Sequence, residues 1–156
     1  IRINNKKKRI HMNKKQIKNH LFNDDIKKAI EYVNSIADEQ TLSIYTFNYN
    51  WDNGFSIPYS ILQNKCCTLN IALLLFDLAD GFTYLKSKED DSDLPDWSKF
   101  VKELYNRIIN KDFIIGKTLY YPQLSKVQLF KLKKYLSKDE FVFITPIDGI
   151  DCRIYL

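Results

Sequence analysis

Residues 69–79, LNIALLLFDLA, impose the strictest condition on the fold, because they form a helix-length stretch with apolar side chains at nearly every position. A helix that is apolar almost all round has to be surrounded by protein. Asp77 and Asp80 interrupt the run, which is far shorter than the roughly 20 apolar residues needed to span a bilayer. We therefore expect this helix, capped by Thr68, to form the centre of a core, with no membrane association.

Five other stretches have helix patterns. The clearest covers residues 97–109, where apolar side chains recur at the spacing of an amphipathic helix, with Pro95 at its start and Asp96 as its expected cap. The others are residues 26–36, with the same spacing; 39 to about 49, capped by Asp38; 56–62, opened by Ser56 and Pro58; and 125 to about 136, where Ser125 and Gln128 have capping-box spacing.

The predicted fold class is mainly α, a compact bundle of about six short helices. The chain has only four Gly and four Pro, too few turn residues for an all-β barrel or sandwich. Its tail from Phe141, FVFITPIDGIDCRIYL, has two β-prone runs around a turn at residues 146–149. These runs are compatible with a small C-terminal β-hairpin or an extended strand packed on the helices.

The first eleven residues, IRINNKKKRIH, carry five basic side chains and no acidic one. Met12 is the single methionine, so we expect residues 1–11 to be a vector-derived or disordered leader and residues 12–156 to form one helical domain. The chain has 24 basic and 19 acidic side chains, and without this leader the balance is 19 to 19. The excess of basic residues that would suggest a nucleic-acid partner then disappears, and we expect no nucleic-acid partner.

Catalytic and metal-binding patterns are missing from the sequence. The histidines are His11 and His20, and we expect His20 to lie in a frayed polar segment, so no Ser/His/Asp or Cys/His system can be assembled. Cys66, Cys67 and Cys152 lack chelating spacing and cannot form a disulfide framework. We predict reduced thiols, no metal, no cofactor and no enzymatic activity.

An acidic loop lies between residues 86 and 96, and leaves two functional interpretations open beside that of a solvated loop. It could be a contact patch for a basic protein, because charge steers association. It could also serve a small hydrolase, because clustered carboxylates raise one another's pKa. The candidate residues are Glu89, Asp90, Asp91, Asp93 and Asp96.

Residues 48–58 are dense in polar and aromatic side chains. Oxygen-bearing side chains alternate here as they do in a calcium-binding loop, but the glycine and the bidentate glutamate of such a loop are missing. We therefore interpret the segment as a helix stop pinned by Trp51 and Phe55, or as a recognition surface. The residues of this motif are Asn48, Tyr49, Asn50, Trp51, Asp52, Gly54, Phe55 and Pro58.

A small basic face is predicted near the C-terminus. Lys131, Lys133, Lys134 and Lys138 lie near Phe130 and Tyr135, as expected for lysines on an amphipathic helix. A nucleic-acid-binding module is the alternative, and it would require strongly salt-dependent binding that survives loss of residues 1–11.

The segment 48–80, NYNWDNGFSIPYSILQNKCCTLNIALLLFDLAD, resembles a bacterial family built around an NYNWDxGF motif, domain of unknown function 4274. The resemblance covers about residues 26–110 and includes the Leu-Ala-Asp end of the apolar helix at Asp80. Asn53, in place of Asp, and the doubled cysteine depart from the family pattern.

What the resemblance implies is a stand-alone cytoplasmic immunity protein, in a toxin–antitoxin or contact-dependent growth inhibition system. Its partner would be one cognate toxin domain, bound and blocked by a chain that is monomeric when free. This implication comes by association with the family, since a fold does not fix a function. We expect the acidic loop to contact the toxin.

Overall fold

The computed structural model describes residues 14–156, so the predicted leader at residues 1–11 lies outside the described part of the chain. The described protein is all-α, as predicted. Residues 14–23 are helical and are followed by α2 (Ile26–Ser35), α3 (Glu39–Phe47), the 3-10 helix η1 (Trp51–Asn53), α4 (Ser56–Gln63), α5 (Leu69–Leu78), α6 (Gly81–Ser87), α7 (Pro95–Ile109), α8 (Lys126–Lys133) and the 3-10 helix η2 (Asp139–Ile144).

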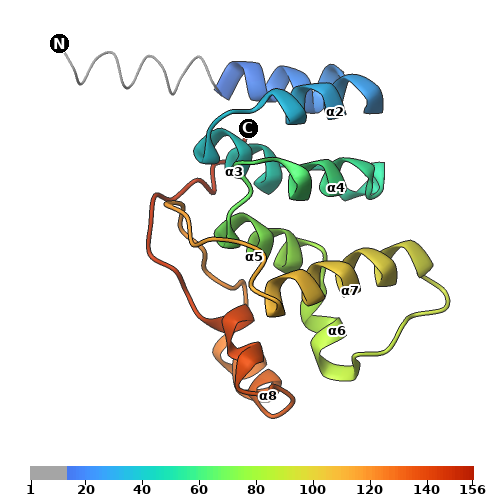
Figure 1. Ribbon diagram of the computed structural model, residues 1–156, viewed down its shortest axis with the longest axis vertical. Coiled ribbons are helices and arrows are strands. Elements are labelled where there is room, and N and C mark those ends of the chain that lie inside the picture. Colours follow the sequence, from blue (N-terminus) through green and yellow to red (C-terminus); the bar gives the residue numbers. More distant parts are fainter. Residues whose placement is uncertain (1–13) are drawn as a thin grey trace.

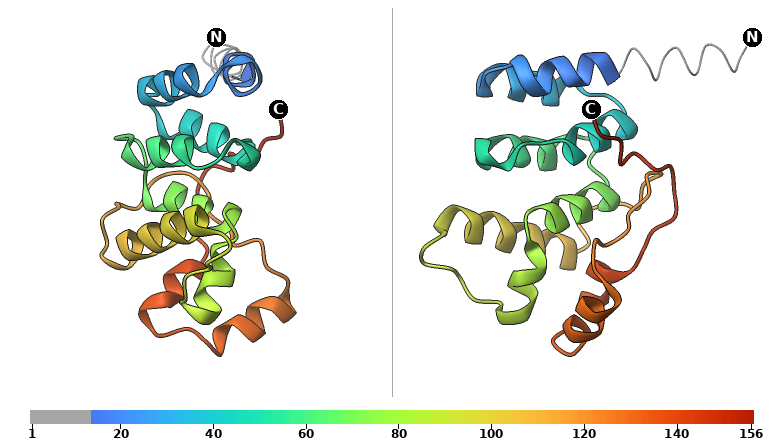
Figure 2. Two further views of the ribbon diagram at one scale, coloured as in Figure 1. Left: turned by 90° about the vertical axis from the view of Figure 1, so that its right-hand side faces the viewer. Right: turned by 180° about the vertical axis from the view of Figure 1, so that it is seen from behind.

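The helices are stacked in layers along the long axis of the molecule (Figures 1 and 2). Residues 14–23 and α2 form the layer at one end, and α3 with α4 forms the next. α5 and α7 follow, while α6, α8 and η2 lie at the opposite end. Each layer covers the apolar side of its neighbour, which is how short amphipathic helices build one core.

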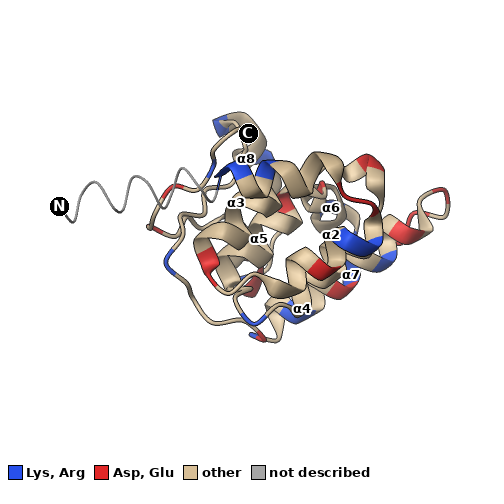
Figure 3. Cartoon of the chain, turned by 90° about the horizontal axis from the view of Figure 1, so that it is seen from above, with Lys and Arg blue, Asp and Glu red and all other residues tan. Residues whose placement is uncertain are grey.

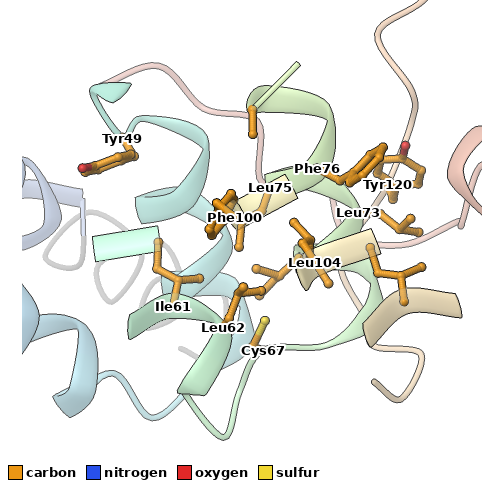
Figure 4. Packing of buried hydrophobic residues seen from close by; sticks show 14 of the residues in the cluster. Tyr49, Ile61, Leu62, Cys67, Leu73, Leu75, Phe76, Phe100, Leu104 and Tyr120 are labelled. Carbon is orange, nitrogen blue, oxygen red and sulfur yellow. The ribbon is translucent and has the colours of Figure 1, made fainter. Parts of the chain in front are cut away.

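α5 is the centre of this core, as the sequence predicted. Residues 70–76 are all buried, and Leu73, Leu75 and Phe76 are completely inaccessible to solvent. Figure 4 shows these side chains packed with Phe100 and Leu104 of α7 on one side and with Tyr120 nearby. No helix within residues 14–156 combines the length and apolar character needed to cross a membrane.

Two predicted helix caps are confirmed. The Asp38 carboxylate accepts the Thr41 amide at 2.8 Å at the start of α3. Ser125 and Gln128 form the full capping box of α8, each side chain accepting the other residue's amide. These polar side chains replace water at the free amides of the first turn, and so fix where each helix begins.

Two other predicted caps are wrong. α7 begins after Leu94 with no side-chain cap, and Asp96 lies inside its first turn, where a carboxylate still favours the positive end of the helix. Thr68 precedes α5, but its hydroxyl donates to the Glu39 carboxylate at 3.0 Å instead of capping the helix. α6 is a helix that the sequence patterns did not predict.

The predicted C-terminal hairpin does not form, and residues 14–156 contain only two isolated β-bridges, Thr118 to Ile150 and Tyr120 to Ile147. The first β-prone run folds as η2, because that geometry buries Phe143 and Ile144. The second run pairs with the distant segment at residues 117–120. The paired backbones approach so closely that a Cβ on Gly149 would lie 2.4 Å from the Lys117 carbonyl oxygen.

The segment after α7 is held by two polar side chains of the helical layers. Glu39 accepts both the Lys117 and Thr118 amides, and the hydroxyls of Thr68 and Thr118, at 2.8–3.0 Å. The buried Asn70 side chain accepts the Gly116 amide at 2.7 Å and donates to the Thr118 carbonyl. Buried polar groups of this kind are stable only when they are paired.

Candidate functional site

The first half of the 48–58 motif supports the fold. Asn48 donates to the Ile154 carbonyl at 2.7 Å and accepts the Leu156 amide at 3.1 Å, so it ties the C-terminal tail to the end of α3. The Tyr49 hydroxyl donates to the Gly54 carbonyl at 2.8 Å. The Asn50 side chain accepts the Asp52 amide at 3.1 Å and starts η1. The interpretation as a helix stop fits these bonds.

Trp51 and Phe55, at the centre of the motif, reach across to α7. Their rings are 5.9 Å apart and tilted edge to face, and the Phe55 ring lies 5.2 Å from the buried Phe100 ring. Both side chains are only partly buried, so part of each ring borders the surface. The Trp51 indole N–H is inaccessible and has no hydrogen-bond partner among the described residues, an unusual cost for a side chain that only fills space.

A groove of about 330 Å³ opens beside these two rings. We call it the Trp51–Trp97 groove. Trp97 of α7 is fixed at its edge, because the indole N–H donates to the Ala79 carbonyl at 2.6 Å. The lining residues are Trp51, Phe55, Leu78, Ala79, Asp80, Thr83, Asp91, Leu94 and Trp97.

Asp80 places its carboxylate at the rim of the groove, and its backbone has an unusual conformation. Its φ of 58° is left-handed, which Asp tolerates better than most residues but which remains uncommon outside glycine. Gly81 follows, and a Cβ there would lie 2.5 Å from the Phe76 ring, so the turn between α5 and α6 is packed directly on the core. The Asp80 carboxylate accepts the Thr83 hydroxyl at 3.0 Å.

The acidic loop forms the opposite rim. Asp91 is anchored on α7, because its amide donates to the Ser98 hydroxyl at 2.7 Å, and its carboxylate accepts the Asp93 amide at 2.9 Å. Asp90 pairs with Lys102 at 3.3 Å. In Figure 3 the loop between α6 and α7 extends away from the body of the molecule and carries acidic segments.

The five residues predicted to contact a partner therefore do not form one site. Asp91 lines the groove, while Asp90 and Asp91 also line a shallow depression of about 600 Å³ beside α7, whose other charged residues include Lys99 and Glu103. Glu89, Asp93 and Asp96 are exposed and line neither.

Burial raises the pKa of Cys67 to about 12 and that of Cys152 to about 11, which keeps both as thiols. Within residues 14–156 no three His, Cys, Asp or Glu side chains are grouped so as to hold a metal ion.

The prediction that His20 lies in a frayed segment is wrong. His20 is in the helix at residues 14–23, where it contacts the Asp24 carboxylate at 2.7 Å and stacks on Tyr32 with 3.8 Å between ring centroids. The depression of about 540 Å³ beside it is lined by no Ser, Thr or Cys, the residues that a Ser/His/Asp or Cys/His system would need.

The architecture defines an all-α domain whose apolar centre, motif and groove lie between α3 and α7. Residues 37–109 match the family described as Domain of unknown function (DUF4274), so the chain carries a DUF4274 domain over this range. This confirms the resemblance, within slightly narrower limits than residues 26–110. No curated protein and no solved structure matches the chain.

Proposed function

We propose that this protein is an immunity protein that binds one cognate toxin domain and blocks it through the Trp51–Trp97 groove and the adjacent acidic loop. The observation that carries the proposal is the groove itself, a concave site lined by aromatic side chains and rimmed by carboxylates. Half-buried tryptophans beside a hydrophobic contact surface are typical of the residues that dominate protein interfaces.

Leu94 also supports binding at this site. It lines the groove and is 54% exposed, although it precedes a helix that packs on the core. An apolar side chain in this position gains most when a partner covers it, at about 25 cal/mol for each Å² removed from water. The acidic loop beside it favours a partner surface of positive charge.

The test is co-expression with the product of the adjacent upstream gene, followed by purification of the complex and a growth assay. We expect a stable complex and rescue of cells that express the toxin. Leu94→Arg should abolish both, because it places a charge in the apolar contact. Ile115→Arg is the matched control, since Ile115 is 69% exposed but lies outside the groove. Equal rescue by both variants would exclude the groove, and no complex with the unaltered chain would refute the proposal.

The same assay addresses a hydrolase that works through the acidic loop. Asp90, Asp91 and Glu103 line the depression beside α7, but Asp90 is paired with Lys102 and Asp91 accepts its own loop amide. We propose no catalytic role for them. An Asp90→Asn/Glu103→Gln chain should still protect cells, and loss of protection with complex formation intact would instead support the hydrolase.

α8 offers a second candidate surface, for nucleic acid. Phe130 is 65% exposed, and the Lys134 ammonium lies 4.9 Å above its ring. Exposed aromatic rings among lysines are the elements with which single strands are bound by stacking. Binding of a single-stranded oligonucleotide that weakens steeply with salt, and persists without residues 1–11, would favour this function.

A further inference from the structure

The two carboxylates of the Trp51–Trp97 groove have no ion-pair partner within the described part of the chain, although Asp91 also borders the depression that contains Lys99, Lys102 and Arg107. Its rim carries Asp80 and Asp91, and none of its lining residues is Lys, Arg or His. No cation of residues 14–156 forms an ion pair with either carboxylate. Their recorded partners are the neutral Thr83 hydroxyl and the Asp93 amide, which leave oxygen lone pairs available.

The walls of the groove suit both the charged head and the apolar stem of a basic side chain. Trp51, Phe55 and Trp97 present three aromatic rings from two separate elements and the turn after η1, and such rings attract cations through their π faces. Leu78, Ala79 and Leu94 supply the apolar surface that the methylene stem of a long basic side chain prefers.

The backbone that carries each carboxylate is constrained by local contacts. Asp80 is fixed by its left-handed turn and by the close contact of Gly81 with Phe76. Asp91 is fixed by the bond from its amide to Ser98. Residues kept in rare backbone conformations cluster at binding sites, where the rest of the fold maintains the strain.

From these observations, and resting on the proposed function, we infer that the groove binds an arginine side chain presented by the toxin. A guanidinium stacks on indole rings and offers five donors to carboxylates that lie on two different elements. An ammonium has three donors on one strongly hydrated point charge, and stacks less well.

The protein contains two tryptophans, and both line the groove, so tryptophan fluorescence excited selectively over that of the ten tyrosines reports on this site. The probe is N-acetyl-arginine amide added to the full chain, with the neutral citrulline and the lysine analogues as comparators. We expect saturable quenching with a Kd on the order of 1 mM for arginine. Citrulline should bind about tenfold more weakly, and lysine should fall between the two.

The variants Asp80→Asn and Asp91→Asn should each weaken arginine binding about fivefold, because each removes one charged acceptor. Asp148→Asn is the control, since Asp148 is exposed and does not line the groove. The inference is overturned if the arginine compound causes no saturable quenching. It is also overturned if citrulline quenches as strongly as arginine, or if lysine binds more tightly than arginine.

The complex with the toxin separates failure of this inference from failure of the proposed function. Capture of the toxin at equal affinity by the unaltered chain and by an Asp80→Asn/Asp91→Asn chain would leave the immunity function standing and exclude an arginine anchor. Capture reduced at least tenfold by the double variant, with Asp148→Asn unaffected, would support both.

Discussion

At the scale of single residues, the fold shifts the pKa values of two carboxyl groups in opposite directions. Burial raises the pKa of Asp77 to about 6, although the Gln123 amide donates to it at 2.8 Å, and nearby Asp80 adds to the rise. Burial would also raise the pKa of Glu39, but the hydrogen bonds from Lys117, Thr118 and Thr68 outweigh it and lower that pKa. The two groups therefore make opposite contributions to the dependence of stability on pH.

The Asp77→Asn variant should be more stable than the unaltered chain at neutral pH. The raised pKa means that ionised Asp77 costs stability above about pH 6, and that this cost disappears as the pH falls below the value for an unfolded aspartate. We expect a gain of about 1–2 kcal/mol at pH 8, because Asn still accepts the Gln123 amide. Urea unfolding at pH 8 and pH 4 measures it. A gain of equal size at both values would contradict the account.

The Glu39→Gln variant should instead be less stable than the unaltered chain at neutral pH. The lowered pKa stabilises the fold above the pKa of an unfolded glutamate, and this stabilisation is lost as the pH falls through the folded value. We expect a loss of about 1–2 kcal/mol at pH 7 that shrinks in acid, because Gln turns one donor toward amides that need acceptors. Glu31→Gln, on an exposed position of α2, is the control and should unfold at the same urea concentration as the unaltered chain.

At the scale of elements, the turn between α5 and α6 determines where the groove lies. Gly81 begins α6 where a Cβ would lie 2.5 Å from the Phe76 ring and 2.6 Å from its carbonyl oxygen. Gly54 ends η1 with a φ of 80° and has open space around it. One glycine is required by packing and the other by backbone conformation.

The pair Gly81→Ala and Gly54→Ala tests this distinction. Gly81→Ala should cost about 2–3 kcal/mol, because helix α5 and the Phe76 ring both have to move. Gly54→Ala should cost about 1 kcal/mol, through backbone strain alone. Thermal unfolding of both variants measures the difference. If Gly54→Ala is the more damaging, then the contact of Gly81 with α5 does not control the turn.

At the scale of the whole molecule, the DUF4274 domain is only part of the core. Residues 37–109 end with α7, yet Ile17 precedes the domain, and Tyr120, Phe143 and Cys152 follow it, all buried in the same cluster. The tail returns to α3, where Asn48 holds it (Figure 1).

Asn48→Ala should therefore loosen the tail and lower global stability together. Removing its bonds to Ile154 and Leu156 should cost about 1–3 kcal/mol and accelerate hydrogen exchange of the tail amides. Asn50→Ala is the matched control in the same motif, since Asn50 is exposed and accepts only the Asp52 amide. Unchanged exchange in the Asn48 variant would show that the tail is held by its apolar contacts instead.

Local patterns in the sequence predicted what local forces determine. α3 and α8 begin at their predicted caps, and α5 and α7 begin within two residues of their apolar stripes although their predicted caps are wrong, because these signals lie close to each helix start. The hairpin prediction failed because the tail's partner, around Tyr120, is remote along the chain. The groove could not be predicted, since Trp51, Asp80 and Trp97 share no periodic pattern and meet only after the layers have packed.

The two sides of the groove differ in how freely they can change over generations. Trp51 and Phe55 contact Phe100 in the core, so substitutions on that wall would weaken the fold. Asp91 and Leu94 stand in an exposed loop, and surface loops in general tolerate changes of length and of side chain better than packed helices do. Under the proposed function, a lineage that keeps the aromatic wall and changes this loop would acquire a preference for a different toxin on the same scaffold.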